Sequence, residues 1–206
     1  MSVIELLASS LDRNDEEPNI ELAEKLCDSM DETGIREIVD GYKTGKKAVA
    51  SDCIKVLYEI GQRKPELISA YADDFITGLQ GRDNRIVWGS MTALSYIART
   101  DPEALFGRLP EIITAYERGS VITVDNSISV FSHLCNAGGD YQARVFPILL
   151  EHLAKCRAKE IPQHAERIAV CIDSDNKSAF IDALNARIEE LIESQKKRVL
   201  KLIKKL

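Results

Sequence analysis

The stretch DNRIVWGSMTALSYIA, residues 83–98, decides the fold of this chain. Its apolar residues Val87, Met91, Leu94 and Ala98 are spaced four, three and four residues apart, as on one face of an α-helix. The same pattern occurs 37 residues earlier and 37 residues later. A constant period of about 20–50 residues is typical of proteins built from stacked supersecondary units. The sequence therefore predicts a repeat protein.

Seven apolar columns follow this period through four successive repeats. Four columns fall in a first helix and three in a second, and turns rich in Gly, Asp, Ser and Lys separate the two helices. The columns are Ile35, Ala72, Leu109 and Phe146; Ile38, Phe75, Ile112 and Leu149; Val39, Ile76, Ile113 and Leu150; Tyr42, Leu79, Tyr116 and Leu153; Ala50, Val87, Val124 and Ile161; Ile54, Met91, Ile128 and Ala165; and Leu57, Leu94, Phe131 and Ile168. Each repeat is therefore expected to be a pair of amphipathic helices.

Helices and no strands are predicted along the whole chain. Pro110 and Pro147 fall inside first helices, where we expect a kink or a short preceding turn, because proline lacks the N–H that continues a helix. The expected helices are 2–12, 20–31, 34–43, 47–62, 66–79, 84–98, 103–117, 122–136, 141–155, 161–173 and 178–204.

One continuous solenoid domain is expected over residues 1–194, with the clearest repeats at 34–173 and atypical capping units at both ends. Residues 195–206 are expected to be a basic amphipathic helical extension. This extension would continue the helix that starts near Ser178 and would outrun the body of the protein. It is solvated, it docks to an acidic surface such as the N-terminal region of another copy, or it contacts a membrane surface or nucleic acid.

The charge of the chain is uneven. The formal net charge is −6, yet residues 196–206 carry six cations and no acid, whereas the first 40 residues carry twelve acids and three cations. A nucleic-acid groove needs a basic face, so the acidic balance makes nucleic acid an unlikely partner. A hydrophobic content of 45% is enough for a sizeable core and argues against wholesale disorder.

The five cysteines indicate a reducing compartment. Their number is odd, and no C-x-x-C pair occurs, which is typical of free thiols in a cytoplasmic protein. The N-terminal MSVIELLASSL lacks the features of a signal peptide. No apolar run approaches the ~18 residues that a membrane span needs.

Three stretches resemble HEAT repeats: the opening stretch at 83–98, LPEIITAYE at 109–117 and FPILLEHL at 146–153. The resemblance implies an all-α, right-handed α-α superhelix (solenoid) of about five two-helix repeats. Armadillo-type and short-HEAT lyase classes stay open as neighbouring families. Such arrays imply protein binding on a concave surface lined by the second helices.

A partner-binding surface is hypothesised on the accessible side of these second helices. Large aromatic residues beside hydrogen-bonding groups are typical of binding hot spots. The alternative is that Trp88 and Tyr96 fill gaps between adjacent repeats. The hypothesised surface consists of Lys55, Glu59, Trp88, Thr92, Tyr96, Asp125, Ser129 and His133.

His152 and Cys156 could form part of a metal site, because their i, i+4 spacing on one helix can chelate an ion. His164 and Cys135 are further ligands that the sequence does not place. We expect a surface histidine and a half-buried cysteine instead, and hence no metal and no cofactor. No phosphate-binding, nucleophile-elbow, zinc-protease or dinucleotide motif occurs, so we expect no enzyme activity.

The predicted function is that of a scaffold, adaptor or regulatory subunit that binds an unidentified protein partner. Self-association through the basic C-terminal helix is a second contact that the sequence suggests. One alternative is a nucleic-acid-binding or DNA-alkylation-repair module, because Trp88 and Asp125 occupy equivalent positions in successive repeats. Another is an accessory subunit of an enzyme such as a lyase.

Overall fold

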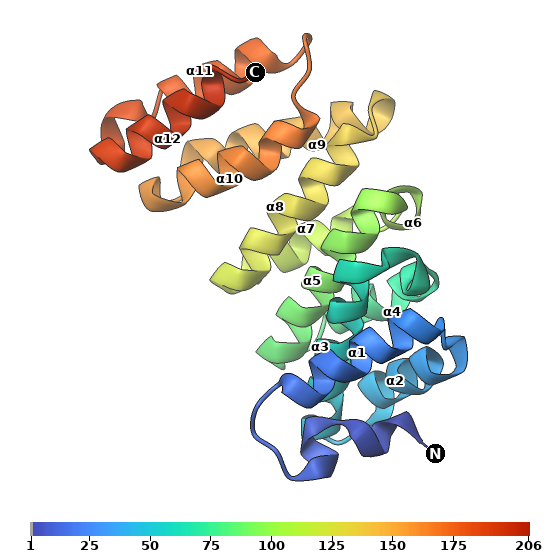
Figure 1. Ribbon diagram of the computed structural model, residues 1–206. Coiled ribbons are helices and arrows are strands. Elements are labelled where there is room, and N and C mark those ends of the chain that lie inside the picture. Colours follow the sequence, from blue (N-terminus) through green and yellow to red (C-terminus); the bar gives the residue numbers. More distant parts are fainter. Residues whose placement is uncertain (1) are drawn as a thin grey trace. The chain divides into compact units, whose positions relative to one another are not determined.

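The computed structural model describes residues 2–206, which form helices and turns without a strand (Figure 1). The chain forms two compact units, Met1–Ser127 and Ile128–Leu206, and each is described by itself. The boundary falls inside helix α8, Val121–Asn136. The all-α repeat architecture predicted from the periodicity is confirmed.

The first unit contains an N-terminal segment of 3₁₀ turns followed by helices that alternate between first and second positions of the repeat. Its elements are η1 (Val3–Leu6), η2 (Ala8–Leu11), α1 (Glu17–Ser29), α2 (Glu32–Thr44), α3 (Lys47–Arg63), η3 (Pro65–Leu67), η4 (Ser69–Tyr71), α4 (Ala72–Gly78), α5 (Asn84–Thr100), α6 (Glu103–Phe106), α7 (Leu109–Arg118) and the first turns of α8.

The second unit also alternates first and second helices. Its elements are the rest of α8, then α9 (Gly139–Lys155), η5 (Ala158–Glu160), α10 (Ile161–Ile168), η6 (Ala169–Cys171), α11 (Lys177–Asn185), η7 (Ile188–Glu190) and α12 (Glu193–Ile203).

The core is made by the repeating columns. The columns that begin with Ile38, Ile54 and Leu57 are buried in all four repeats. The column that begins with Ala50 is less regular, because Val87 and Val124 are only half-buried. The period therefore identifies the core positions of both units, and the second-helix positions nearest the turn contribute least.

Two glycines let α3 and α5 pack closely. A Cβ atom added to Gly89 on α5 would lie 2.6 Å from Cγ1 of Ile54 on α3, and one added to Gly61 on α3 would lie 3.2 Å from the Tyr96 ring on α5. Both distances are shorter than ordinary van der Waals contact. The tight approach of these neighbouring second helices thus depends on glycine at both positions.

The helix predicted at 2–12 is wrong, because this segment forms two 3₁₀ turns. Side chains from elsewhere in the first unit take its backbone N–H groups. Asn19 Oδ1 accepts from the Ala8 N–H (3.0 Å), and Asp52 Oδ2 accepts from the Ser9 N–H (2.8 Å). The segment then ends at Asp12 in the left-handed conformation. Side-chain acceptors offer the backbone an alternative to the helical ladder.

The first helices predicted at 66–79 and 103–117 are also interrupted. In the former, the chain makes 3₁₀ bonds and the Ser69 hydroxyl donates to the Pro65 carbonyl at 3.2 Å, so a regular helix begins only at Ala72. In the latter, α6 ends at Phe106 and α7 restarts at Leu109. The short preceding turn expected at Pro110 is confirmed.

At Pro147 the helix is not interrupted. Helix α9 runs through it from Gly139 to Lys155. Pro147 and Ala143, whose carbonyl loses its helical partner, are both exposed. Water can therefore satisfy that carbonyl, so proline is tolerated inside this helix.

The prediction of a single C-terminal helix from Ser178 to about Lys204 is wrong. Helix α11 ends at Asn185, and Arg187 donates to the carbonyls of Leu153 (2.8 Å) and Cys156 (3.0 Å) at the end of α9. A 3₁₀ turn follows before α12 begins at Glu193.

Helix α12 packs on α10 and is not a free extension. Val199 is fully buried, and Arg198 binds Glu166 on α10 through both Nε (2.6 Å) and Nη2 (2.5 Å). The last residues thus belong to the second unit. Anchoring by Arg187 lets the chain reverse and bury Val199.

The second-helix face of the first unit as a candidate functional site

Three second helices lie side by side in the first unit, with α3 between α1 and α5 (Figure 1). We call the surface they share the second-helix face. Helix α1 was predicted only as part of an atypical cap, yet it packs against α3 as α3 packs against α5. The face therefore starts one repeat earlier than the clearest periodicity.

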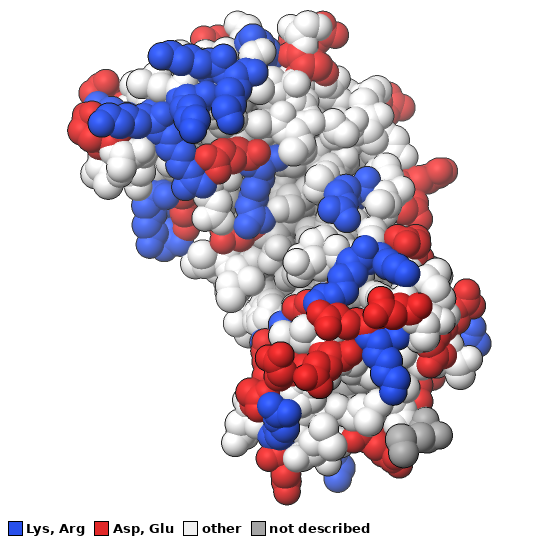
Figure 2. Space-filling view, in the orientation of Figure 1, with Lys and Arg blue, Asp and Glu red and all other residues white. Residues whose placement is uncertain are grey.

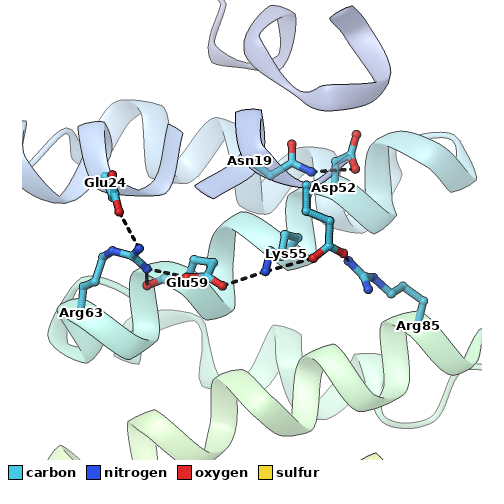
Figure 3. Close-up of polar contacts among 8 residues, drawn as sticks. Asn19, Glu24, Asp52, Lys55, Glu59, Arg63 and Arg85 are labelled. Carbon is cyan, nitrogen blue, oxygen red and sulfur yellow. Dashed lines mark hydrogen bonds and ion pairs between the residues drawn. The ribbon is translucent and has the colours of Figure 1, made fainter. Parts of the chain in front are cut away.

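Ion pairs of alternating charge cross the face from α1 to α5 (Figure 3). Glu24 pairs with Arg63 (2.8 Å), Arg63 with Glu59 (2.5 Å), and Glu59 with Lys55 (2.8 Å). Lys55 then pairs with Glu16 (3.1 Å), which also binds Arg85. We call this set the ionic ladder; its members are Glu16, Glu24, Lys55, Glu59, Arg63 and Arg85.

The centre of the ionic ladder is closed to a partner. Only 9% of the Lys55 side chain and 12% of the Glu59 side chain are exposed. Burial alone would lower the pKa of Lys55, but the hydrogen bonds and charges of Glu59 and Glu16 outweigh it and raise this pKa. Lys55 is thus held as a cation between two carboxylates. Its charge stabilises contacts inside the unit and is not available to a partner.

The carboxylates respond in the opposite direction. Burial would raise the pKa of Glu59, but hydrogen bonds from Lys55 and Arg63 bring it below its usual value. The pKa of Glu16 is likewise lowered by Arg85 and Lys55 against the effect of burial. All ladder carboxylates with a resolved shift therefore favour the ionised form, as expected for acids beside fixed cations.

Trp88 lies half-buried at the α3–α5 seam. Its ring is 5.7 Å from the Tyr58 ring, and the Arg85 guanidinium lies 4.6 Å above the indole. One side of the indole therefore packs on α3, as expected if Trp88 fills a gap between adjacent repeats. Trp88 as a whole is nevertheless only half-buried.

Thr92 and Tyr96 follow Trp88 at intervals of four residues on α5. The Thr92 hydroxyl donates to the Trp88 carbonyl (2.8 Å) and accepts from Asn126 Nδ2 (2.9 Å). Tyr96 packs over Gly61 and is half-buried. Trp88, Thr92 and Tyr96 thus form a partly exposed stripe along α5, which we call the α5 stripe.

The remaining hypothesised residues divide between the units. Asp125 is half-buried in the first unit. Ser129 and His133 belong to the second unit, where Ser129 accepts a hydrogen bond from Arg167 Nη1 at 2.6 Å and His133 is half-buried. The partner-binding role of all eight residues stays a prediction.

Five residues of this site were missed from the sequence: Glu16, Glu24, Arg63, Arg85 and Asn126. Glu16 lies in the segment 13–19, which was assigned to a loop, so no periodicity marked it. Arg63 had a usable signal, because Glu59 precedes it by four residues and such pairs support a helix. Arg85 and Asn126 are found only from packing of neighbouring helices.

A cavity of about 480 Å³ lies elsewhere in the first unit, at the turns that join first to second helices. Gly81 and Arg82 line it from the turn before α5, and Arg118 and Gly119 from the end of α7. None of the hypothesised partner-binding residues lines this cavity.

In the second unit, His152 and His164 are buried, with exposed fractions of 5% and 0%. The expectation of a surface histidine at position 152 is therefore wrong. His152 Nε2 and His164 Nδ1 lie 2.8 Å apart, and Cys156 is half-buried beside them. Burial raises the pKa of the Cys156 thiol to about 11, although the nearby Arg187 lowers it.

No helix of residues 2–206 is both long and apolar enough to cross a bilayer. No protein-family model matches the chain, and no curated protein matches it.

Solved structures of engineered repeat proteins share the fold. A computationally designed armadillo repeat protein for modular peptide recognition has a TM-score of 0.67 at 12% identity, over 89% of this chain and 85% of its own. A designed armadillo repeat protein in complex with the peptide (KR)4 has a TM-score of 0.64 at 14% identity, over 89% and 86%. An engineered protein aligns over 100% of both chains with a TM-score of 0.63 at 17% identity. The chain therefore has an armadillo/HEAT-like solenoid fold.

Proposed function

We propose that the chain is a protein-binding scaffold that holds an extended, Lys- and Arg-rich polypeptide segment on the second-helix face of its first unit. Binding, and not catalysis, is then the activity of the chain. The observation that carries the proposal is the α5 stripe, whose aromatic rings stay partly exposed next to carboxylates of the ionic ladder.

The aromatic part of the site supplies contact area. Trp88 and Tyr96 lie two helical turns apart on α5. Large rings fixed by packing on one side lose little conformational freedom when a partner covers the other side, which is why Trp and Tyr are enriched in hot spots. The contacts with Tyr58 and Gly61 fix these rings before any partner arrives.

The charged part of the site favours a cationic partner. Residues 1–127 contain 23 acidic and 14 basic residues, a formal charge of −9. Glu16 and Glu24 are 46% and 55% exposed, so their outer oxygens can accept further hydrogen bonds. Acidic side chains gather with fewer cations on the face of this unit that Figure 2 shows. Such a field attracts and orients a cationic segment.

The fold neighbours support an extended peptide as the ligand. One designed armadillo protein was made for modular peptide recognition, and another is in complex with the peptide (KR)4. A row of parallel second helices presents side chains at regular intervals, which suits a ligand with a regular extended repeat.

Fluorescence of Trp88, the only tryptophan of the chain, tests the proposal directly. An octapeptide of alternating Lys and Arg should change the emission saturably, whereas an octapeptide of alternating Glu and Asp should not. The double variant Glu24→Gln, Asp28→Asn, on exposed positions of α1, should weaken binding about tenfold, because it removes about 1.4 kcal/mol of charge-assisted contact.

The matched control is the double variant Asp40→Asn, Glu117→Gln, which makes the same charge change on exposed positions of the first helices α2 and α7. It should bind almost as tightly as the unaltered chain. If both double variants weaken binding equally, the attraction is only overall charge. An absence of any saturable change with the cationic octapeptide would overturn the proposal.

A further inference from the structure

Two imidazoles and a thiol meet between α9 and α10 of the second unit, and peptide binding does not account for them. His152 lies in the last turn of α9, Cys156 is the residue that caps this helix, and His164 lies on α10. One ligand atom from each residue lies within 4.8 Å of the other two. Within residues 2–206, no further His, Cys, Asp or Glu joins this group.

We propose that His152, Cys156 and His164 form a zinc-binding site, with water as the fourth ligand. Two imidazole nitrogens and one thiolate are a ligand set that zinc prefers. Calcium and magnesium, which take oxygen ligands, are excluded by this donor set.

The geometry needs only small shifts to accept the ion. With Zn–N of about 2.0 Å and Zn–S of about 2.3 Å, tetrahedral ligand atoms are about 3.3–3.7 Å apart. The two nitrogens are 2.8 Å apart, so the rings must separate by about half an ångström. The sulfur lies within 4.8 Å of both nitrogens, so it must approach by at most about 1.5 Å. Side-chain rotation at the end of a helix provides shifts of this size.

The backbone around the site is held in place. Arg187 donates to the carbonyls of Leu153 (2.8 Å) and Cys156 (3.0 Å), which fixes the last turn of α9. The Cys156 N–H donates to the His152 carbonyl at 2.8 Å. Two of the ligands are therefore positioned by α9 and its cap, and the half-buried thiol leaves a path for the ion and its water.

Both imidazoles are neutral in the zinc complex. The imidazole that donates the 2.8 Å hydrogen bond between His152 Nε2 and His164 Nδ1 moves its N–H to its other nitrogen through solvent exchange, so both nitrogens are free to bind zinc. The Cys156 thiol loses its proton to solvent and binds as thiolate. One proton is released per zinc ion, and the ion then ties α9 to α10.

Cobalt(II) titration of the metal-free full chain in the absence of other thiols tests the proposal. The expected result is one equivalent bound, with a thiolate-to-cobalt charge-transfer band and the intense visible bands of a tetrahedral ion. Zinc should then displace cobalt and abolish these bands. Zinc at a hundredfold excess over its Kd should also raise the melting temperature by about 5–10 °C.

Variants locate the site. Cys156→Ser should remove the charge-transfer band, and His152→Gln should weaken cobalt binding at least tenfold. Cys171→Ser, which removes another buried thiol of the same unit, should leave both unchanged. Circular dichroism of each metal-free variant separates loss of ligand from loss of fold. A charge-transfer band that persists in Cys156→Ser, or that is absent from the unaltered chain, would overturn the proposal.

Discussion

The two units use the same apolar columns but have different polar contacts between their helices. In the first unit, six alternating charges run from α1 across α3 to α5. In the second unit, α10 and α12 are joined at the surface by Arg198 and Glu166, and α9 and α10 meet at two buried imidazoles. Packing is thus common to all repeats, whereas polar contacts are particular to each pair of helices.

The two units also differ in net charge. The first unit has a formal charge of −9, and residues 128–206, with 10 acidic and 13 basic residues, have +3. Figure 2 shows Lys and Arg gathered over the C-terminal helices of the second unit. Repeats with the same 37-residue period can therefore have surfaces of opposite charge, because the apolar columns constrain only the buried positions.

Loss of a core side chain should have the largest effect. Leu94 on α5 is fully buried, and Leu94→Ala should cost about 2–5 kcal/mol through lost burial and the remaining cavity. Ile168→Ala, in the same column of the second unit, should cost a similar amount. Urea unfolding followed by hydrogen exchange should locate each loss in its own unit. If either variant lost protection from hydrogen exchange equally in both units, the two units would unfold as one, which would contradict their separate description.

Overpacking between α3 and α5 should come next. Gly89→Ala places a methyl group 2.6 Å from Ile54 and should cost about 1–3 kcal/mol. Gly107→Ala is the control: nothing lies within 4 Å of the added Cβ and its backbone is right-handed helical, so it should be neutral or stabilise by about 0.4–1 kcal/mol. Thermal unfolding measures both, and equal costs would contradict close packing at Gly89.

The ionic ladder should make the first unit sensitive to acid. The pKa values of Glu59 and Glu16 are below the usual 4.5, so their contribution to stability is complete above that value and is lost as the pH falls through the lower folded-state values. Glu59→Gln should cost about 1–2 kcal/mol at pH 7 and reduce this acid sensitivity. Hydrogen exchange of the first unit between pH 7 and about 3 is the measurement. An unchanged acid profile in the variant would contradict the role of Glu59.

The exposed ion pair of the second unit should matter least. Arg198 and Glu166 are 50% and 42% exposed, so Arg198→Gln should cost less than about 1 kcal/mol. Deletion of residues 195–206 should cost more, because it also removes the buried Val199 from its contact with α10. If the deletion left the stability of the second unit unchanged, residues 195–206 would be a free extension that does not contribute to the fold.

The second helices α3, α5 and α8 were predicted to within two residues, since they carry strong 3.6-residue periodicity and short turns. The first helices were predicted less well. A proline in the sequence did not decide whether a helix is interrupted: α9 runs through Pro147, whereas a break between α6 and α7 precedes Pro110, although both prolines are exposed. The N-terminal turns depended on acceptors from Asn19 and Asp52, which periodicity cannot reveal.

The accessibility of three residues of the hypothesised site could be predicted, whereas the role of the site stays a prediction. Position on a second helix identified Trp88, Thr92 and Tyr96 as partly accessible, and these side chains are half-buried on one face of α5. The same reasoning did not reveal that Lys55 and Glu59 are engaged with each other and with Arg63 and Glu16. Charge partners on neighbouring helices lie far apart in sequence, so only packing brings them together.

The sequence by itself determined the repeat, its two-helix unit and the buried columns, because burial of one helical face requires only a local periodicity. Tertiary structure decided which polar residues would face one another. Lys55 met Glu16 across two helices, Arg187 ended the helix predicted to continue, and His152 met His164 from the next helix. The physical reason is that polar contacts are directional and short-ranged, so they depend on the positions of neighbouring backbones that a hydrophobic pattern does not specify.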